Sequence, residues 1–211
     1  MSVIFERDIV KFSLVGVCFL LVLFSRRDAL HKKDHLFLLL AMSATLIADL
    51  FLVLFHIYPV GVFVFWGAHV FYSLRFAGKK VWPFFLAALP LSIIILITTS
   101  DVLTAAASGY AALFVISYTT AILAIKRKKY PTPNIMLIGV GMTFFLICDI
   151  FVMLANLSHI GHGSAALSNF AFDAIWMFYA PAKVCLALSA IRFERSPILS
   201  PEAKMPQQDS G

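Results

Sequence analysis

The chain has 211 residues, of which 61% are hydrophobic and 13% are charged, and its mean hydropathy is +0.92. Soluble globular domains are roughly half apolar and a quarter charged, so this composition excludes a soluble domain and indicates an integral membrane protein. The net charge of +6 does not indicate a nucleic-acid-binding protein, because the basic residues stand in short clusters between apolar runs.

The apolar runs predict an all-α fold, a polytopic bundle of seven transmembrane helices. A membrane-spanning helix needs about 20 mostly apolar residues, and about 17 can suffice. Breaking the chain at clusters of charged residues, Pro and Gly gives spans at 8–25, 36–56, 60–77, 82–99, 102–125, 134–156 and 168–191. The first run ends in SRRD rather than in a small-residue cleavage site, so we expect a retained helix and not a signal peptide.

Two regions follow from this division. Residues 1–193 are expected to form a single transmembrane domain. Residues 194–211 are polar and rich in Pro, and they predict a flexible cytoplasmic tail because they carry too little apolar surface to order themselves.

Basic residues alternate between the loops, and this alternation predicts the orientation. Lys and Arg occur in RRDALHKKD, RFAGKK, KRKK and RFER, which follow the first, third, fifth and seventh spans. The intervening loops HIYP, TTSD and NLSHIGHGSAALS contain none. Because Lys and Arg collect in cytoplasmic loops, we expect the N-terminus outside and the C-terminus inside. The expected location is a cell membrane or, in a eukaryote, the endoplasmic reticulum membrane.

The cysteines and histidines do not predict a metal centre. Cys18, Cys148 and Cys185 lie in apolar runs without CxxC or Cys/His spacing, so neither a disulfide framework nor a zinc site is expected. His159 and His162 form an HxxH pair, but no carboxylate or third imidazole is spaced to complete a site. We therefore expect no metal and no cofactor.

Two segments of the chain resemble each other. LIADLFLVL, at 46–54, and LICDIFVML, at 146–154, place Asp49 and Asp149 in matching apolar contexts. In the spans that follow, AHV with His69 pairs with AKV with Lys183. Because an even number of crossings separates the matching spans, the sequence predicts a parallel internal repeat of the second and third spans with the sixth and seventh.

Polar residues on these four spans are candidates for a shared polar pocket. An Asp inside a spanning helix costs about 2.5 to 3.5 kcal/mol on insertion scales, so it usually faces the bundle interior, pairs, or takes part in chemistry. Helical spacing places His69 with Tyr72, and Tyr179 with Lys183, on shared helix faces. A purely structural alternative is an ion pair between Asp149 and Lys183.

The same residues give the chain a resemblance to the lysoplasmalogenase, or YhhN-type, family of membrane proteins. The matching motifs are Ala48-Asp49, the segment GAHVFY at Gly67–Tyr72, the segment FLICD at Phe145–Asp149, and the final span from Tyr179 to Ser189. The resemblance extends from about residue 41 to residue 192. It implies a hydrolase that cleaves the vinyl ether bond of lysoplasmalogens and releases a fatty aldehyde and a glycerophospho-headgroup.

The residues suit this chemistry. Hydrolysis of a vinyl ether begins with slow protonation of a carbon atom and gives an oxocarbenium ion that water captures. The reaction needs a protonated acid and a nearby anion, and two carboxyl groups in one dry pocket can hold protons with unequal strength, as at glycosidic bonds. We expect Asp49 and Asp149, beside His69, to supply the general acid and the charge-stabilising base, with the order of their roles left open.

A lysophospholipid substrate and the surrounding membrane lipid are the implied partners. We expect Tyr72 and Tyr179 to hydrogen-bond the headgroup or position water, and Lys183 or Arg75 to hold the phosphate. Arg75 stands beside further basic residues at the inner end of its span, so its simplest interpretation is a snorkelling anchor. No nucleic acid partner is expected, and a homodimer is left open.

Three other functions fit part of the pattern. A proton-coupled transporter of a small solute or lipid also uses intramembrane Asp, His and Lys in a repeat. A retinal protein shares seven helices and a Lys in the last span, but Tyr179 stands one turn before that Lys, where such proteins usually carry Asp. The third alternative is a catalytically silent scaffold in which Lys183 neutralises Asp149.

Overall fold

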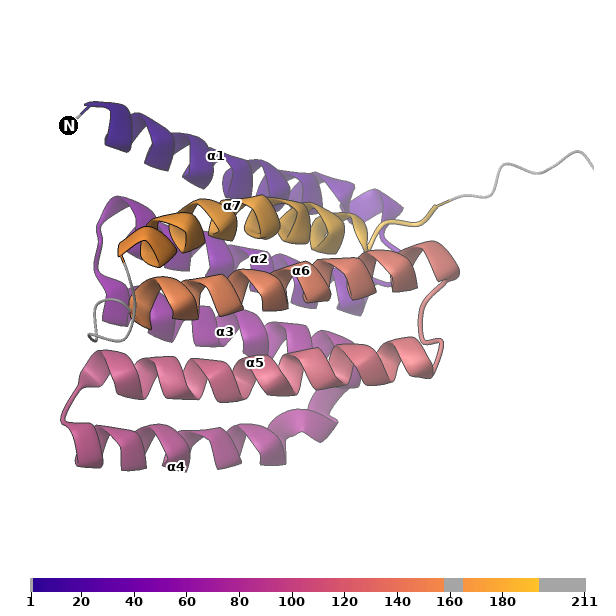
Figure 1. The fold of residues 1–211 in the computed structure, drawn as a ribbon. Coiled ribbons are helices and arrows are strands. Elements are labelled where there is room, and N and C mark those ends of the chain that lie inside the picture. Colours follow the sequence, from indigo (N-terminus) through magenta and orange to yellow (C-terminus); the bar gives the residue numbers. More distant parts are fainter. Residues whose placement is uncertain (1, 158–164, 194–211) are drawn as a thin grey trace, which may run out of the picture.

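The structure is a computed structural model and describes residues 2–157 and 165–193. Its α-helices are α1 (Ser2–Phe24), α2 (Lys32–Asp49), α3 (Tyr58–Ala77), α4 (Trp82–Thr99), α5 (Val102–Lys126), α6 (Thr132–Leu157) and α7 (Ala165–Leu188) (Figure 1). No strand occurs in the two described ranges, so the expected all-α fold is confirmed. The predicted tail, 194–211, and the HxxH pair of His159 and His162 lie outside the described residues.

The helices lie side by side in one bundle, with α1 and α4 at opposite edges (Figure 1). Helix α3 packs against α2 and α5, helix α6 packs against α7, and α4 packs mainly against α5. The interior includes the fully buried side chains of Leu38, Met42, Ile138 and Leu186. Helix α1 adds Val15, Cys18 and Val22 to the same core, whereas the buried hydrophobic residues of α4 belong to a separate, smaller cluster.

The outer surface of the bundle is apolar. Exposed side chains include Leu86, Ile97 and Met177, with 65%, 75% and 72% of their surface accessible. Six stretches of the described residues are long and apolar enough to cross a membrane, and one of them, 58–99, contains both α3 and α4. The chain is a multi-pass membrane protein. The number of crossings, the orientation and the internal repeat stay predictions.

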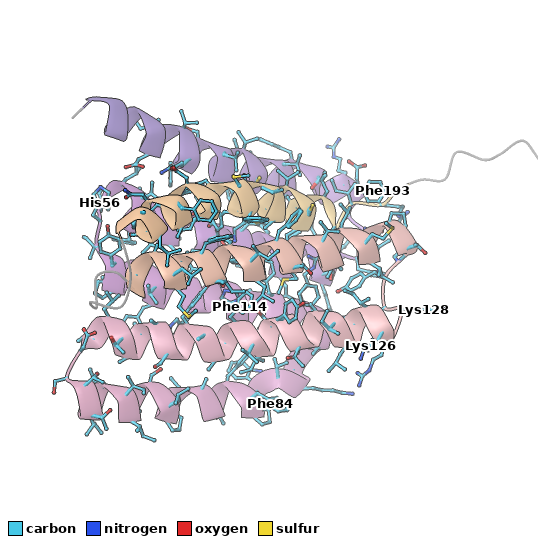
Figure 2. All side chains as sticks on the ribbon, viewed as in Figure 1. His56, Phe84, Phe114, Lys126, Lys128 and Phe193 are labelled. Atoms are coloured by element: carbon cyan, nitrogen blue, oxygen red, sulfur yellow. The ribbon has the colours of Figure 1, made fainter. Side chains whose placement is uncertain are left out.

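The basic loops gather at one end of the bundle. Figure 2 shows Lys126 and Lys128 at the end opposite His56, which belongs to the loop without Lys or Arg. At the basic end, Ala29 and Ile191 form an isolated antiparallel bridge that joins the loop after α1 to the chain after α7. This separation of charge is what the predicted orientation requires.

Helix ends follow local signals in the sequence. Helix α3 begins with Tyr58-Pro59 and is followed by Gly78 at a φ of 65°, a conformation that favours glycine. Asp101 caps α5 by accepting hydrogen bonds from the backbone N–H groups of Leu103, at 3.1 Å, and Thr104, at 3.0 Å. The Thr104 hydroxyl also donates to this carboxyl, and these bonds hold the pKa of Asp101 below its ordinary value.

Helix α2 ends differently from the expected span of 36–56. Directly after Asp49 the backbone widens into a π-helical turn over Leu50–Leu54, in which the Phe55 N–H donates to the Leu50 carbonyl at 3.1 Å. Such turns are rare and occur frequently at functional sites. The first of the two matched Asp residues therefore lies at a backbone irregularity, while Asp149 lies within the continuous helix α6.

Candidate functional site

Each of the two matched carboxyl groups receives a hydrogen bond from a tyrosine on another helix. The Tyr179 hydroxyl, on α7, donates to Asp49 Oδ2, on α2, at 2.7 Å. The Tyr110 hydroxyl, on α5, donates to Asp149 Oδ2, on α6, at 2.8 Å. Asp49 is buried and Asp149 is half-buried. We refer to these four residues, with His69 and Lys183, as the central polar cluster.

Lys183 lies fully buried in this cluster. Its Nζ atom has no hydrogen-bond partner among the described residues and lies 3.8 Å from the ring centroid of Phe145 and 4.6 Å from that of Tyr179. An ammonium over aromatic faces is attracted by the ring quadrupoles. The ion pair of Lys183 with Asp149, which the sequence left open as a structural alternative, is not formed among the described residues, where aromatic rings contact the amine.

Electrostatic interactions connect the two carboxyl groups. Lys183 interacts with both Asp49 and Asp149. Each carboxyl group also accepts its hydrogen bond from a tyrosine, Tyr179 or Tyr110. The buried amine of Lys183 is therefore the group whose charge acts on both Tyr–Asp pairs.

His69 on α3 lies beside the Asp149 half of the cluster. Its ring centroid is 4.9 Å from that of Tyr110 and 5.3 Å from that of Phe145. Its Nδ1 atom lies 2.9 Å from the Ser117 hydroxyl on α5. Its Nε2 atom is buried and has no hydrogen-bond partner in the described part of the chain. One ring nitrogen of His69 is therefore hydrogen-bonded to Ser117, and the other has no partner in the described residues.

Tyr72 lies one turn beyond His69, and the rings of the two residues are 6.2 Å apart, as their spacing predicted. The Tyr72 side chain is fully buried, and its hydroxyl donates to the Met42 sulfur at 3.8 Å. Tyr72 interacts electrostatically with both Asp49 and Arg75. It therefore connects the central polar cluster to a second polar group nearer the basic end of the bundle.

Arg75 belongs to that second group and is not a snorkelling anchor, so this expectation is wrong. Its side chain is buried, and Nε donates to Asp34 Oδ2 at 3.0 Å in an ion pair with α2. Nη1 donates to the Ser189 hydroxyl at 2.9 Å, whereas Nη2 has no partner among the described residues. The guanidinium joins α2, α3 and the end of α7 because burial requires a paired charge.

Two residues of the loop after α5 complete the second group, which we call the Arg75 cluster: Asp34, Arg75, Lys129, Tyr130 and Ser189. The Tyr130 hydroxyl donates to Asp34 Oδ1 at 2.5 Å, and burial beside this carboxylate raises the pKa of Tyr130. Lys129 Nζ donates to the carbonyls of Arg75 and Phe76, both at 2.9 Å, at the end of α3. Partial burial lowers the pKa of Lys129.

Sequence reasoning missed Tyr110, Ser117 and Asp34. Tyr110, Phe114 and Ser117 occupy positions i, i+4 and i+7 of α5, so they share one helix face. That spacing is a usable signal, but it does not say which helix the face meets. Asp34 stands in the basic loop sequence RRDALHKKD, where its neighbours suggest a solvated position.

Comparison with known proteins assigns the chain to a family. The model of the YhhN family matches residues 7–190, which include every residue of the central polar cluster and of the Arg75 cluster. No curated protein and no solved structure matched the chain. The match begins earlier than residue 41, where the resemblance in the sequence began, and includes most of α1. The chain belongs to the YhhN family, which is the lysoplasmalogenase family.

Proposed function

We propose that this protein hydrolyses the vinyl ether bond of lysoplasmalogens and releases a fatty aldehyde and a glycerophospho-headgroup. The observation that supports this proposal most directly is the central polar cluster, in which Asp49 and Asp149 share one buried ammonium, Lys183. Membership of the YhhN family supports the same reaction type. The alkenyl chain of the substrate would remain in the lipid phase that surrounds the bundle.

The count of charges in the cluster suits acid catalysis. A dry site disfavours net charge, and Lys183 supplies one positive charge. The cluster is neutral when the two carboxyl groups together hold one proton. One carboxyl group is then a protonated acid and the other a carboxylate, which are the two species that the reaction needs, as at glycosidic bonds.

The reaction proceeds in three balanced steps. The protonated carboxyl group gives its proton to the vinyl carbon that is not bonded to oxygen. The double bond supplies the electron pair of the new C–H bond. The resulting oxocarbenium ion is stabilised by the carboxylate. Water adds to the cationic carbon and gives one proton to a base in the site. The hemiacetal then collapses to the aldehyde: the glycerol oxygen takes up the proton from that base, and the hemiacetal hydroxyl gives its proton to the carboxylate that served as the acid.

The tyrosines act on the carboxyl groups in this proposal. Tyr179 donates to Asp49, so we assign it to orienting this carboxyl rather than to the headgroup. Tyr72 would line the site next to His69. A phosphate contact of Arg75 would use Nη2, the guanidinium nitrogen without a partner in the described residues, since Nε and Nη1 are committed.

The test is reconstitution of the purified protein with a 1-alkenyl lysophospholipid and measurement of released aldehyde. We expect release by the wild type and loss of about 10²- to 10⁴-fold in Asp49→Asn and in Asp149→Asn, since general acid catalysis contributes about this factor. Asp8→Asn is the matched control, because Asp8 lies on α1 with Lys11, outside the central polar cluster. Release that survives both central substitutions would contradict the mechanism.

Proton-coupled transport of a small solute or lipid is the second candidate. The observation that favours it is the buried Lys183 amine, which has no hydrogen-bond partner in the described residues and interacts electrostatically with both carboxyl groups. Buried groups of this kind also relay protons in carriers. Vesicles that contain the protein distinguish the two functions. Solute or lipid movement with an intact vinyl ether would favour the transporter, and aldehyde without movement would favour the hydrolase.

A further inference from the structure

Two hydrogen bonds of Ser117 determine which nitrogen of His69 carries the proton. Ser117 Oγ lies 2.9 Å from His69 Nδ1 and 2.9 Å from the carbonyl oxygen of Phe114. A serine hydroxyl has one proton to donate, and a carbonyl oxygen can only accept. Both bonds form only when Ser117 donates to Phe114 and accepts from a protonated Nδ1.

The other ring nitrogen is then left with its lone pair. A neutral imidazole carries one N–H, so protonation at Nδ1 leaves Nε2 as an acceptor. Nε2 is buried and has no donor among the described residues. A buried acceptor without a donor costs free energy, so this atom is a position where a water or substrate group would be bound.

The ring that carries this acceptor packs against two side chains that contact the reacting groups of the proposed function. The His69 ring contacts Tyr110, which donates to Asp149, and Phe145, whose face carries the Lys183 amine. A water molecule bound to Nε2 would therefore lie at the edge of the central polar cluster.

We propose that Ser117 is a positioning residue that holds His69 as the Nδ1–H tautomer, and that His69 Nε2 accepts a proton from the water that attacks the oxocarbenium ion. This inference rests on the proposed function and adds the identity of the proton acceptor. The imidazole is the side chain most often used for such transfers near neutral pH.

The proton transfers balance. As the water oxygen bonds to the cationic carbon, one water O–H bond breaks and its proton moves to Nε2. When the hemiacetal collapses, the imidazolium returns that proton to the departing glycerol oxygen. The hemiacetal hydroxyl proton moves to the carboxylate that served as the acid, which restores both groups.

The first test measures the tautomer directly. In protein with ¹⁵N-labelled histidine, the ring signals of His69 are assigned by their loss in His69→Gln. We expect a protonated Nδ1 and an unprotonated Nε2 in the wild type, and an increased Nε2–H population in Ser117→Ala. An unprotonated Nδ1 in the wild type would overturn the inference. This measurement needs no substrate, so it remains decisive if the protein cleaves no vinyl ether.

The second test measures aldehyde release. We expect Ser117→Ala to lower kcat by about 2- to 10-fold with KM unchanged, because the loss of one hydrogen bond corresponds to about this factor. Ser117→Thr keeps the hydroxyl and should restore part of the rate. Thr120→Val is the matched control, since Thr120 is a buried hydroxyl on the same helix that bonds the Ser117 carbonyl and not His69. Equal kcat in Ser117→Ala and the wild type would refute the positioning role.

Discussion

The Tyr179 hydroxyl on α7 donates a hydrogen bond of 2.7 Å to Asp49 on α2, across 130 residues of sequence. The corresponding contact of Asp149 comes from Tyr110 on α5 and not from α7 or α3. Each carboxyl group is thus oriented by a phenol from outside its own predicted repeat half. The two Asp residues match in sequence, but they have different surroundings, which suits a pair with unequal roles.

Removing either phenol should impair the reaction. In Tyr179→Phe and Tyr110→Phe the ring remains, and only the hydrogen bond to Asp49 or Asp149 is lost. Hydrogen bonds to charged groups contribute about 1.5 to 3 kcal/mol, so we expect kcat/KM for aldehyde release to fall by about 10- to 100-fold in each variant. The measurement is the initial rate with a 1-alkenyl lysophospholipid over a range of substrate concentrations.

Tyr118→Phe provides the control for both substitutions. Tyr118 also lies on α5, where its ring stacks on that of Phe114, 6.1 Å away. Its hydroxyl has no part in the central polar cluster, so we expect a rate near that of the wild type. If all three variants retained wild-type rates, the phenol–carboxyl contacts would have no role in the chemistry.

Lys183→Met should lower the activity without lowering the stability. The substitution keeps the length of the side chain and removes a buried ammonium that lacks a carboxylate partner in the described residues. Without its charge, both carboxyl groups can hold protons, and the stabilising anion is lost. We expect kcat to fall by about 10²-fold. The melting temperature in detergent should stay the same or rise, because protonation of the second carboxyl group leaves the cluster neutral and the desolvation cost of the ammonium is removed.

Lys11→Met is the comparison for this variant. Lys11 also lies over an aromatic ring, that of Trp176, at 5.1 Å, but it is partly exposed and pairs with Asp8. It should leave kcat unchanged. If the Lys183→Met protein were fully active, the charge of Lys183 would not be what keeps one of the two carboxyl groups ionised.

Helix positions were largely predictable because their signals are local. The expected span 102–125 and helix α5, Val102–Lys126, agree within one residue, since Asp101 caps one end and the KRKK segment follows the other. The π-helical turn at Leu50–Leu54 was not predictable. An uninterrupted run of Leu, Val and Phe favours a buried helix and carries no information about how the backbone hydrogen bonds shift.

The contacts between helices were less predictable than the helices. The sequence places Tyr179 and Lys183 on one face correctly, because that relation is set by helical spacing alone. It cannot say that Tyr179 meets Asp49 or that Tyr110 meets Asp149, since these contacts depend on which helices become neighbours. The prediction for Arg75 was wrong for a related reason. A basic residue near a helix end is expected at the lipid interface, and the sequence does not show that its partner is Asp34.

The ion pair of Arg75 with Asp34 should support the fold. Arg75→Met leaves a buried carboxylate without its partner, which costs about 3 to 5 kcal/mol of unfolding free energy. The double variant Asp34→Leu with Arg75→Met removes both charges and should recover part of this loss. Chemical unfolding in detergent measures both effects. The exposed Lys79, just after α3, is the control: if Arg75→Met lowered the free energy of unfolding by no more than Lys79→Ala does, Arg75 would act only as a surface anchor.

The packing of α6 against α7 should depend on one of two nearby glycines. A Cβ atom added at Gly141 would lie 2.9 Å from Leu186 Cγ and 3.2 Å from Cys185 Cβ, both on α7, whereas at Gly139 the nearest atom is Ile125 Cδ1 at 3.5 Å. Replacing Gly by Ala within a helix gains about 0.4 to 1 kcal/mol, but overpacking costs about 1 to 3 kcal/mol. We therefore expect Gly141→Ala to lower the melting temperature and Gly139→Ala to keep or raise it. Because α7 carries Tyr179 and Lys183, Gly141→Ala should also slow aldehyde release, and equal behaviour of the two variants would contradict the close contact of these helices.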